Sequence, residues 1–219
     1  GGYTGLLGEV EGDAYGNSDA IAGSIGTSAM LVVGAPDASG GIGHTYVYQV
    51  GGSTGGDVII DNVISLPASG ITAEQNGVYT LDAFVGDGTN KNYGYSVDVA
   101  KMIDNSFVVV SGAPSYSDLS QFGDIRYQVF DSAGKKVQDV SNVYSSISSS
   151  LGGGSISGEL FGSQVSLSDT GEFMAIVAPQ RPIGVGSRRS RIVYMRWNPS
   201  TSKYVLDNTY ISAQADDFS

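Results

Sequence analysis

The only histidine of the chain, His44, is the first residue to consider for catalysis or metal binding. The chain has no second histidine and no cysteine that could complete a metal site or a nucleophile–base pair with it. A lone histidine beside Gly43 at the start of an aromatic segment is more often a hydrogen-bonded structural residue. The segment 51–55 (GGSTG) matches the hydrolase nucleophile elbow in letters, but that motif requires a strand followed by a helix, and here we expect a turn between two strands. The sequence therefore nominates no catalytic residue, and we expect a protein that is not an enzyme.

The arginines are the second group of side chains that could do chemistry. Residues 1–90 contain no Lys or Arg, whereas a cluster of arginines lies between 181 and 196. A planar guanidinium binds carboxylates and sulfates through paired hydrogen bonds. We expect this cluster to dock an acidic partner, either another protein subunit, another copy in a self-assembly, or an acidic glycan; the alternative is a solvated loop. The candidate partner-binding residues are Arg181, Arg188, Arg189 and Arg191.

Composition limits the class of protein and of partner. A net charge of −11 argues against nucleic acid, because phosphate binding needs a basic surface. No apolar run approaches the ~18 residues of a membrane helix, so we expect no membrane span in this sequence. Thirty-two glycines and 13 tyrosines, with 41% hydrophobic residues, favour short strands joined by tight turns around a buried core. The composition predicts an all-β fold.

The chain repeats itself three times, and the repeats position the residues discussed above. In each repeat an aromatic–glycine pair precedes a strand pattern, an apolar run ends in Ala-Pro, and an aromatic strand pattern and an Asn-containing segment follow. Gly34 and Gly112 precede Ala-Pro in the first two repeats, whereas the third repeat lacks this glycine. The repeat markers are Tyr15, Gly16 and Pro36, then Tyr93, Gly94 and Pro114, then Phe161, Gly162 and Pro179. The Asn-containing segments are 61–65, 141–145 and 207–212. Four landmarks recur in the same order three times, so the similarity between the segments is a true repeat and not a chance match.

Each repeat predicts four strands, and the fourth strand contains the Asn-containing segment. Alternation with a period of two indicates a half-buried first strand, and the continuous apolar run indicates a second strand buried on both faces. Proline ends that strand because it cannot donate to a central ladder. Four antiparallel strands in each repeat are typical of a β-propeller blade. We predict blade 1 at 13–92, blade 2 at 93–160, where 145–158 is a flexible Ser/Gly loop, and blade 3 at 161–219.

The order of these motifs resembles the FG-GAP repeats of integrin α-chain propellers. The resemblance covers about residues 13 to 219 and implies a β-propeller at the cell surface or outside the cell. Three blades do not close a ring. We therefore expect a partial propeller, cut from a longer protein or else completed by another chain. Residues 1–12 would be the end of a preceding blade or a linker, and the C-terminal residues the start of a further blade.

Integrin-type blades often hold calcium in a loop between their first two strands, which needs about six oxygen ligands. The matching turns here, at 25–28, 103–106 and 168–171, each offer at most one carboxylate. We expect plain hairpins, and therefore no cofactor and no metal in them. Asp82 and Asp87 remain weaker calcium candidates, with solvated loop residues as the alternative. Any other calcium site of such a propeller would lie in blades outside this sequence.

The sequence thus predicts a non-catalytic extracellular interaction or structural module, used for cell-surface adhesion or for assembling a surface or filament structure. The alternative is a propeller that binds a glycan or another ligand and is attached to an enzyme domain outside this sequence.

Overall fold

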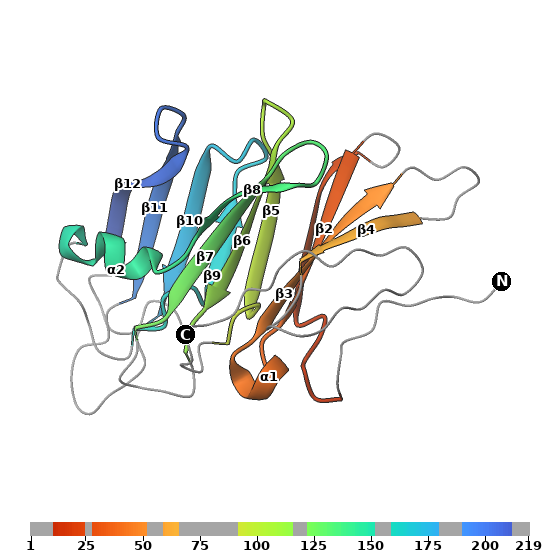
Figure 1. Ribbon diagram of the computed structural model, residues 1–219. Helices are drawn as coiled ribbons and strands as arrows, with labels where there is room; N and C mark the ends of the chain where they lie inside the picture. Colours follow the sequence, from red (N-terminus) through yellow and green to blue (C-terminus); the bar gives the residue numbers. More distant parts are fainter. Residues whose placement is uncertain are drawn as a thin grey trace.

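The computed structural model describes residues 11–24, 28–51, 59–65, 92–115, 122–151, 159–179 and 190–211. Most of these residues lie in strands, which form three antiparallel sheets of four strands each. The all-β prediction is confirmed. The sheets stand side by side in an open row in the order of the chain (Figure 1).

Each sheet takes its four strands from one of the three repeats. Sheet 1 contains β1 (Ser18–Ser24), β2 (Ser28–Ala35), β3 (His44–Gly51) and β4 (Ile59–Ser65). Sheet 2 contains β5 (Ser96–Lys101), β6 (Phe107–Ala113), β7 (Asp124–Phe130) and β8 (Lys136–Val140). Sheet 3 contains β9 (Gln164–Leu167), β10 (Phe173–Ala178), β11 (Arg191–Asn198) and β12 (Lys203–Ile211).

Sheet 2 shows why these residues form strands. Every residue of β6 is buried, as its continuous apolar run predicts for a strand covered on both faces. The first strand, β5, buries Val97 and Val99 alternately. Between β5 and β6 the chain turns at Asn105, which has a left-handed φ of 65° that Asn tolerates well.

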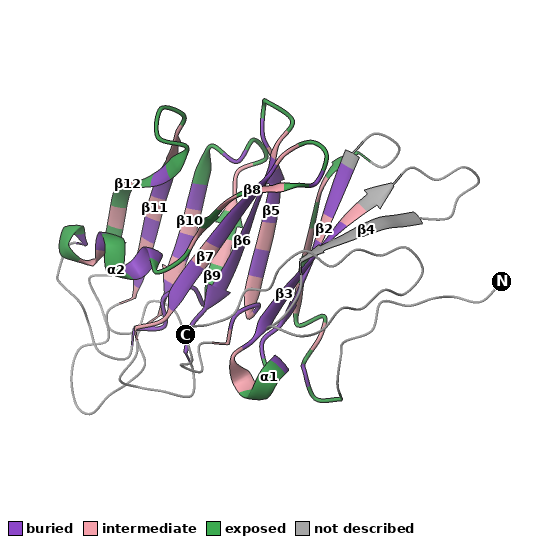
Figure 2. Ribbon diagram, viewed as in Figure 1, coloured by how far each residue is buried: buried purple, intermediate pink, exposed green. Residues whose placement is uncertain are grey.

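The hydrophobic core lies between neighbouring sheets. Met30 and Val32 of sheet 1 pack with Val97, Val99 and Phe107 of sheet 2. A larger cluster joins sheets 2 and 3 and includes Val108, Tyr127, Phe161, Met174 and Ile176. Figure 2 shows the buried residues concentrated on the middle strands of the row. Apolar burial therefore stabilises the sheets mainly against one another.

One strand prediction is wrong. The Asn-containing segment of the second repeat, 141–145, does not continue a fourth strand, because β8 ends at Val140 and helix α2 (Val143–Ile147) follows. The short 3₁₀-helix η1 (Ser148–Ser150) comes next, so the first part of the expected Ser/Gly loop is ordered in helical turns. Asn142, at a φ of 56°, turns the chain, and the helix buries Tyr144 against Phe161. Burying this aromatic ring outweighs continued strand pairing.

One further short element completes the description. A helical turn, α1 (Ala38–Gly41), connects β2 to β3. The longest described helix, α2, has five residues, so no helix in this part of the chain could span a membrane.

Candidate functional site: the junctions between sheets and the cleft beside them

The contact between sheets 1 and 2, here called the first junction, uses the repeat motifs themselves. The Ser18 hydroxyl of β1 donates to the carbonyl of Gly94 over 2.9 Å. Ser18 pairs across the strands with Gly34, the glycine before Ala-Pro. A Cβ atom at Gly34 would collide with the Gly94 carbonyl, so only glycine admits this approach. The aromatic–glycine corner of sheet 2 is thereby held on the face of sheet 1.

The contact between sheets 2 and 3, the second junction, repeats this arrangement. The Ser96 hydroxyl donates to the carbonyl of Gly162 over 2.9 Å. Ser96 pairs across the strands with Gly112, where an added Cβ would meet the same carbonyl. The φ angles of Gly94 and Gly162 are 85° and 88°, so the two corners have the same backbone shape.

A backbone contact closes each junction. In the first, the Tyr93 N–H donates to the Ile42 carbonyl over 3.1 Å, and Gly43 bridges to Tyr93. In the second, the Phe161 N–H donates to the Phe122 carbonyl over 2.9 Å, and Gly123 bridges to Phe161. Both bridging glycines directly precede the third strand of their repeats.

The aromatic markers lie at corresponding positions. Tyr93 and Phe161 are 3% and 0% exposed at the two junctions. Tyr15 is half-buried within sheet 1, and its hydroxyl lies 2.7 Å from that of Tyr48. The glycine that follows Tyr15 has a φ of 84°, matching the other two corners. The markers Pro36, Pro114 and Pro179 directly follow β2, β6 and β10.

A titratable residue begins the third strand of every sheet and is buried. His44, Asp124 and Arg191 are 1%, 2% and 1% exposed, and each pairs with the alanine of its Ala-Pro motif. His44 lies 3.1 Å from the Ser39 hydroxyl, and burial lowers the pKa of its imidazole to about 4 against the opposing effect of the Asp13 charge. Asp124 accepts the Tyr144 N–H over 2.9 Å. These contacts give His44 and Asp124 structural roles.

Arg191 is buried, so it does not belong to the exposed partner-binding cluster that the sequence predicts. Its Nε is 2.8 Å from the Glu159 carboxylate, and both side chains are 1% exposed. Glu159 also accepts a hydrogen bond from the Tyr144 hydroxyl over 3.1 Å. The Arg191 guanidinium therefore forms a buried ion pair with Glu159. The other three candidate arginines, Arg181, Arg188 and Arg189, lie outside the described residues.

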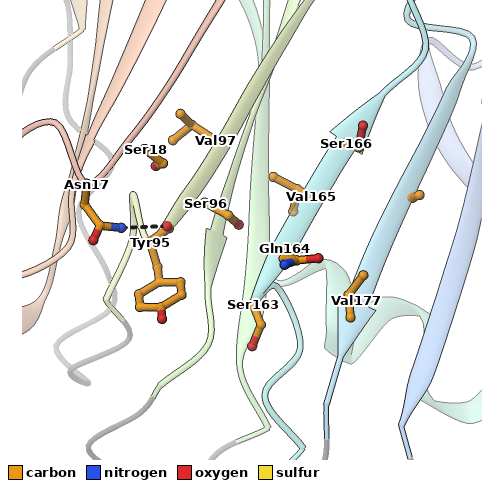
Figure 3. Close-up of a pocket in the computed structure, with 11 residues that line it drawn as sticks. Asn17, Ser18, Tyr95, Ser96, Val97, Ser163, Gln164, Val165, Ser166 and Val177 are labelled. Carbon is orange, nitrogen blue, oxygen red and sulfur yellow. Dashed lines mark hydrogen bonds between the residues drawn. The ribbon is translucent and has the colours of Figure 1, made fainter. Parts of the chain in front are cut away.

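The cleft shown in Figure 3 lies beside the first strands of the sheets and could hold a ligand. It has a volume of about 500 Å³. Hydroxyl and amide side chains line much of it, namely Asn17, Ser18, Ser96, Ser163, Gln164 and Ser166. Three of them already hold a neighbouring sheet, since Asn17 donates to the Tyr95 carbonyl over 2.8 Å, Ser18 bonds Gly94 and Ser96 bonds Gly162. The described lining contains no acidic or basic residue, so the cleft suits neutral polar groups.

The carboxylate in the hairpin turn at 103–106, where the sequence predicts no metal, is held within its own turn. Asp104 binds the Ser106 backbone N–H over 3.0 Å and the Ser106 hydroxyl over 2.5 Å, which lowers the pKa of its carboxyl group. Among the described residues, no group of three or more His, Cys, Asp or Glu side chains could hold a metal ion. Asp82 and Asp87 lie outside the described residues.

Asp98 makes a contact between sheets that the sequence did not indicate. Its carboxylate accepts the Leu167 N–H over 2.6 Å and the Val99 N–H over 2.8 Å. Asp98 thus satisfies a backbone donor on the edge of β9, which a free edge strand would leave unpaired. No local pattern distinguishes this aspartate from a solvated one.

No protein-family model and no curated protein sequence matches the chain.

Proposed function

We propose that the chain is part of an FG-GAP-type β-propeller and acts as a non-catalytic interaction or structural module at the cell surface or outside the cell. The observation that carries this proposal is the repeated junction. In both junctions the serine, the glycine before Ala-Pro and the aromatic–glycine corner hold neighbouring sheets together. The recurring residues serve assembly of the fold, and this use supports a structural role for the repeats.

The order of strands supports blades as the interpretation of the sheets. β5 contacts both β1 and β9, so the first strands of the three sheets lie next to one another. In a propeller the first strands line a central axis and successive blades face one another around it. The junctions supply the contacts that such an arrangement needs.

The interaction role follows from the charge distribution. Because the first ninety residues carry no basic side chain, the cluster of Arg181, Arg188 and Arg189 is the main basic feature of a chain with net charge −11. Its chemistry suits an acidic partner, which is another subunit or copy in a surface assembly, or an acidic glycan.

The test is charge reversal with a matched control. The Arg188→Glu/Arg189→Glu variant should lose association, measured by light scattering at low salt, while its circular dichroism stays unchanged. The Lys135→Glu/Lys203→Glu variant changes the net charge equally at two exposed positions and should associate like the unmodified chain. Association that is indifferent to salt and survives the arginine reversal would contradict the proposal, because exposed charges are screened beyond ~10 Å at 0.1 M salt.

A second candidate function is capture of a neutral polar ligand, such as a glycan, by a propeller attached to an enzyme domain. The hydroxyl and amide lining of the cleft favours it. Calorimetric titration with neutral oligosaccharides tests this candidate, and Gln164→Ala should weaken any binding because Gln164 is an exposed lining residue.

A further inference from the structure

The three sheets are not equivalent in their ability to accept a neighbour. The receiving residues, defined as the first-strand serine, the glycine opposite it and the glycine before the third strand, occur in sheets 1 and 2. They are Ser18, Gly34 and Gly43 in sheet 1, and Ser96, Gly112 and Gly123 in sheet 2. The corresponding residues of sheet 3 are Gln164, Val177 and Ser190. All three positions differ in the last sheet.

These differences remove the features that make a junction. A Cβ atom at Gly34 or Gly112 would occupy the place of the incoming glycine carbonyl, and Val177 carries such an atom. Gly43 and Gly123 have φ angles of 80° and 76° and lie against the backbone of Tyr93 and Phe161. Ser190 is not among the residues with positive φ. Sheet 3 therefore cannot receive an aromatic–glycine corner in the way that sheets 1 and 2 do.

Sheet 1, in contrast, has an aromatic–glycine corner that is not docked on another described sheet. Gly16 has the φ of a seated corner, 84°, but no described atom lies within 4 Å of a Cβ built there. On β1, the strand that follows this corner, Ile21 is 57% exposed, whereas Val99, its counterpart in sheet 2, is 6% exposed because sheet 1 covers it. The corner of sheet 1 thus has the same backbone shape as the two docked corners, and Ile21 leaves an apolar side chain exposed on β1 beside it.

We propose that the corner formed by Tyr15, Gly16 and Ile21 binds a further four-stranded sheet of the same kind, one that has serine and two glycines at the receiving positions, and that this partner is not a second copy of the chain. Within each copy, the receiving residues of sheets 1 and 2 are already occupied, and sheet 3 has side chains in place of both glycines. The inference rests on the junctions that support the proposed function but is independent of the arginine cluster.

The experiment converts sheet 3 into a receiving sheet. The triple variant Gln164→Ser/Val177→Gly/Ser190→Gly should self-associate head to tail, raising the weight-average mass in sedimentation about twofold or more. Adding Ile21→Lys should return that mass to the value of the unmodified chain. A control with the same residue changes at other positions, Gln138→Ser/Val205→Gly/Ser202→Gly, should not associate. At about 1 M salt, where the screening length is about 3 Å, any association through the arginine cluster is suppressed.

Two results would overturn the inference. One is a folded triple variant that sediments like the unmodified chain. The other is an unmodified chain that associates at high salt and loses this association with Ile21→Lys, since a second copy would then fill the corner. If circular dichroism shows that the triple variant does not fold, the Val177→Gly variant replaces it, with a smaller shift that Ile21→Lys also removes; absence of that shift counts against the inference. Failure of the arginine reversal test leaves these outcomes unaffected.

Discussion

Replacing Gly112 with alanine should separate sheets 2 and 3. The added methyl group would meet the Gly162 carbonyl and the Ser96 hydroxyl, both too close for ordinary contact. Overpacking of this kind costs about 1–3 kcal/mol. Displacing the Ser96 hydrogen bond to Gly162 adds about 1 kcal/mol. We therefore expect Gly112→Ala to lower the free energy of unfolding by about 2–4 kcal/mol.

Gly40 provides the matched control. Its φ is 71° and no described atom lies within 4 Å of an added Cβ, so Gly40→Ala pays only the backbone penalty of about 1 kcal/mol. Urea unfolding measures both variants, and the single tryptophan, Trp197 in β11, reports directly on sheet 3. If Gly112→Ala is no more destabilising than Gly40→Ala, the glycine does not serve close approach and the described junction is wrong.

Three other substitutions or conditions test the account. Arg191→Met should cost about 3–5 kcal/mol because it leaves the Glu159 carboxylate buried without its partner, whereas Arg196→Met, which breaks an exposed pair with Asp207, should cost about 1 kcal/mol or less in the same urea assay. Phe161→Ala should cost about 3–5 kcal/mol, since the ring is fully buried, and Phe173→Ala, at an exposed ring, far less; equal losses would contradict the placement of the corner. The folded-state pKa of His44, about 4, lies below the usual 6.5, so the unfolded chain binds the proton more tightly than the folded chain does. The free energy of unfolding should therefore fall as the pH is lowered from 6.5 to 4, by about 2 kcal/mol at pH 5. A His44→Gln variant should lack this component of the pH dependence.

Most of the secondary structure could be predicted from the sequence, because most strands have a recognisable local pattern of apolar and polar residues. The buried run of β6 and the alternation of β5 can be recognised from a few residues, and the Ala-Pro steps mark the ends of the second strands. The helix α2 had no such signal. Its formation depends on packing of Tyr144 against Phe161 and on the Asp124 carboxylate, both distant in sequence.

The roles of the glycines could be predicted only in part. The repeat alignment found Gly34 and Gly112, but what they contact is a carbonyl some fifty or sixty residues further on, which the alignment does not reveal. The commitment of Arg191 to Glu159 was hidden for the same reason, since a cluster of arginines in a sequence looks alike whether its members face solvent or a buried carboxylate. Pairing across sheets is a property of the assembled fold.

A disulfide between sheets 1 and 2 tests most directly whether neighbouring repeats pack face to face. The hydroxyl oxygens of Thr45 and Ser111 are 2.6 Å apart and both residues are buried. The chain has no cysteine of its own, so the Thr45→Cys/Ser111→Cys variant contains a single pair. Disulfides form only when the two Cβ atoms lie within about 4.5 Å. Mass spectrometry after mild oxidation should show a nearly complete intramolecular disulfide in the Thr45→Cys/Ser111→Cys variant. The control variant Thr45→Cys/Ser163→Cys should form no such disulfide. A folded Thr45→Cys/Ser111→Cys protein that keeps both thiols free would contradict the account.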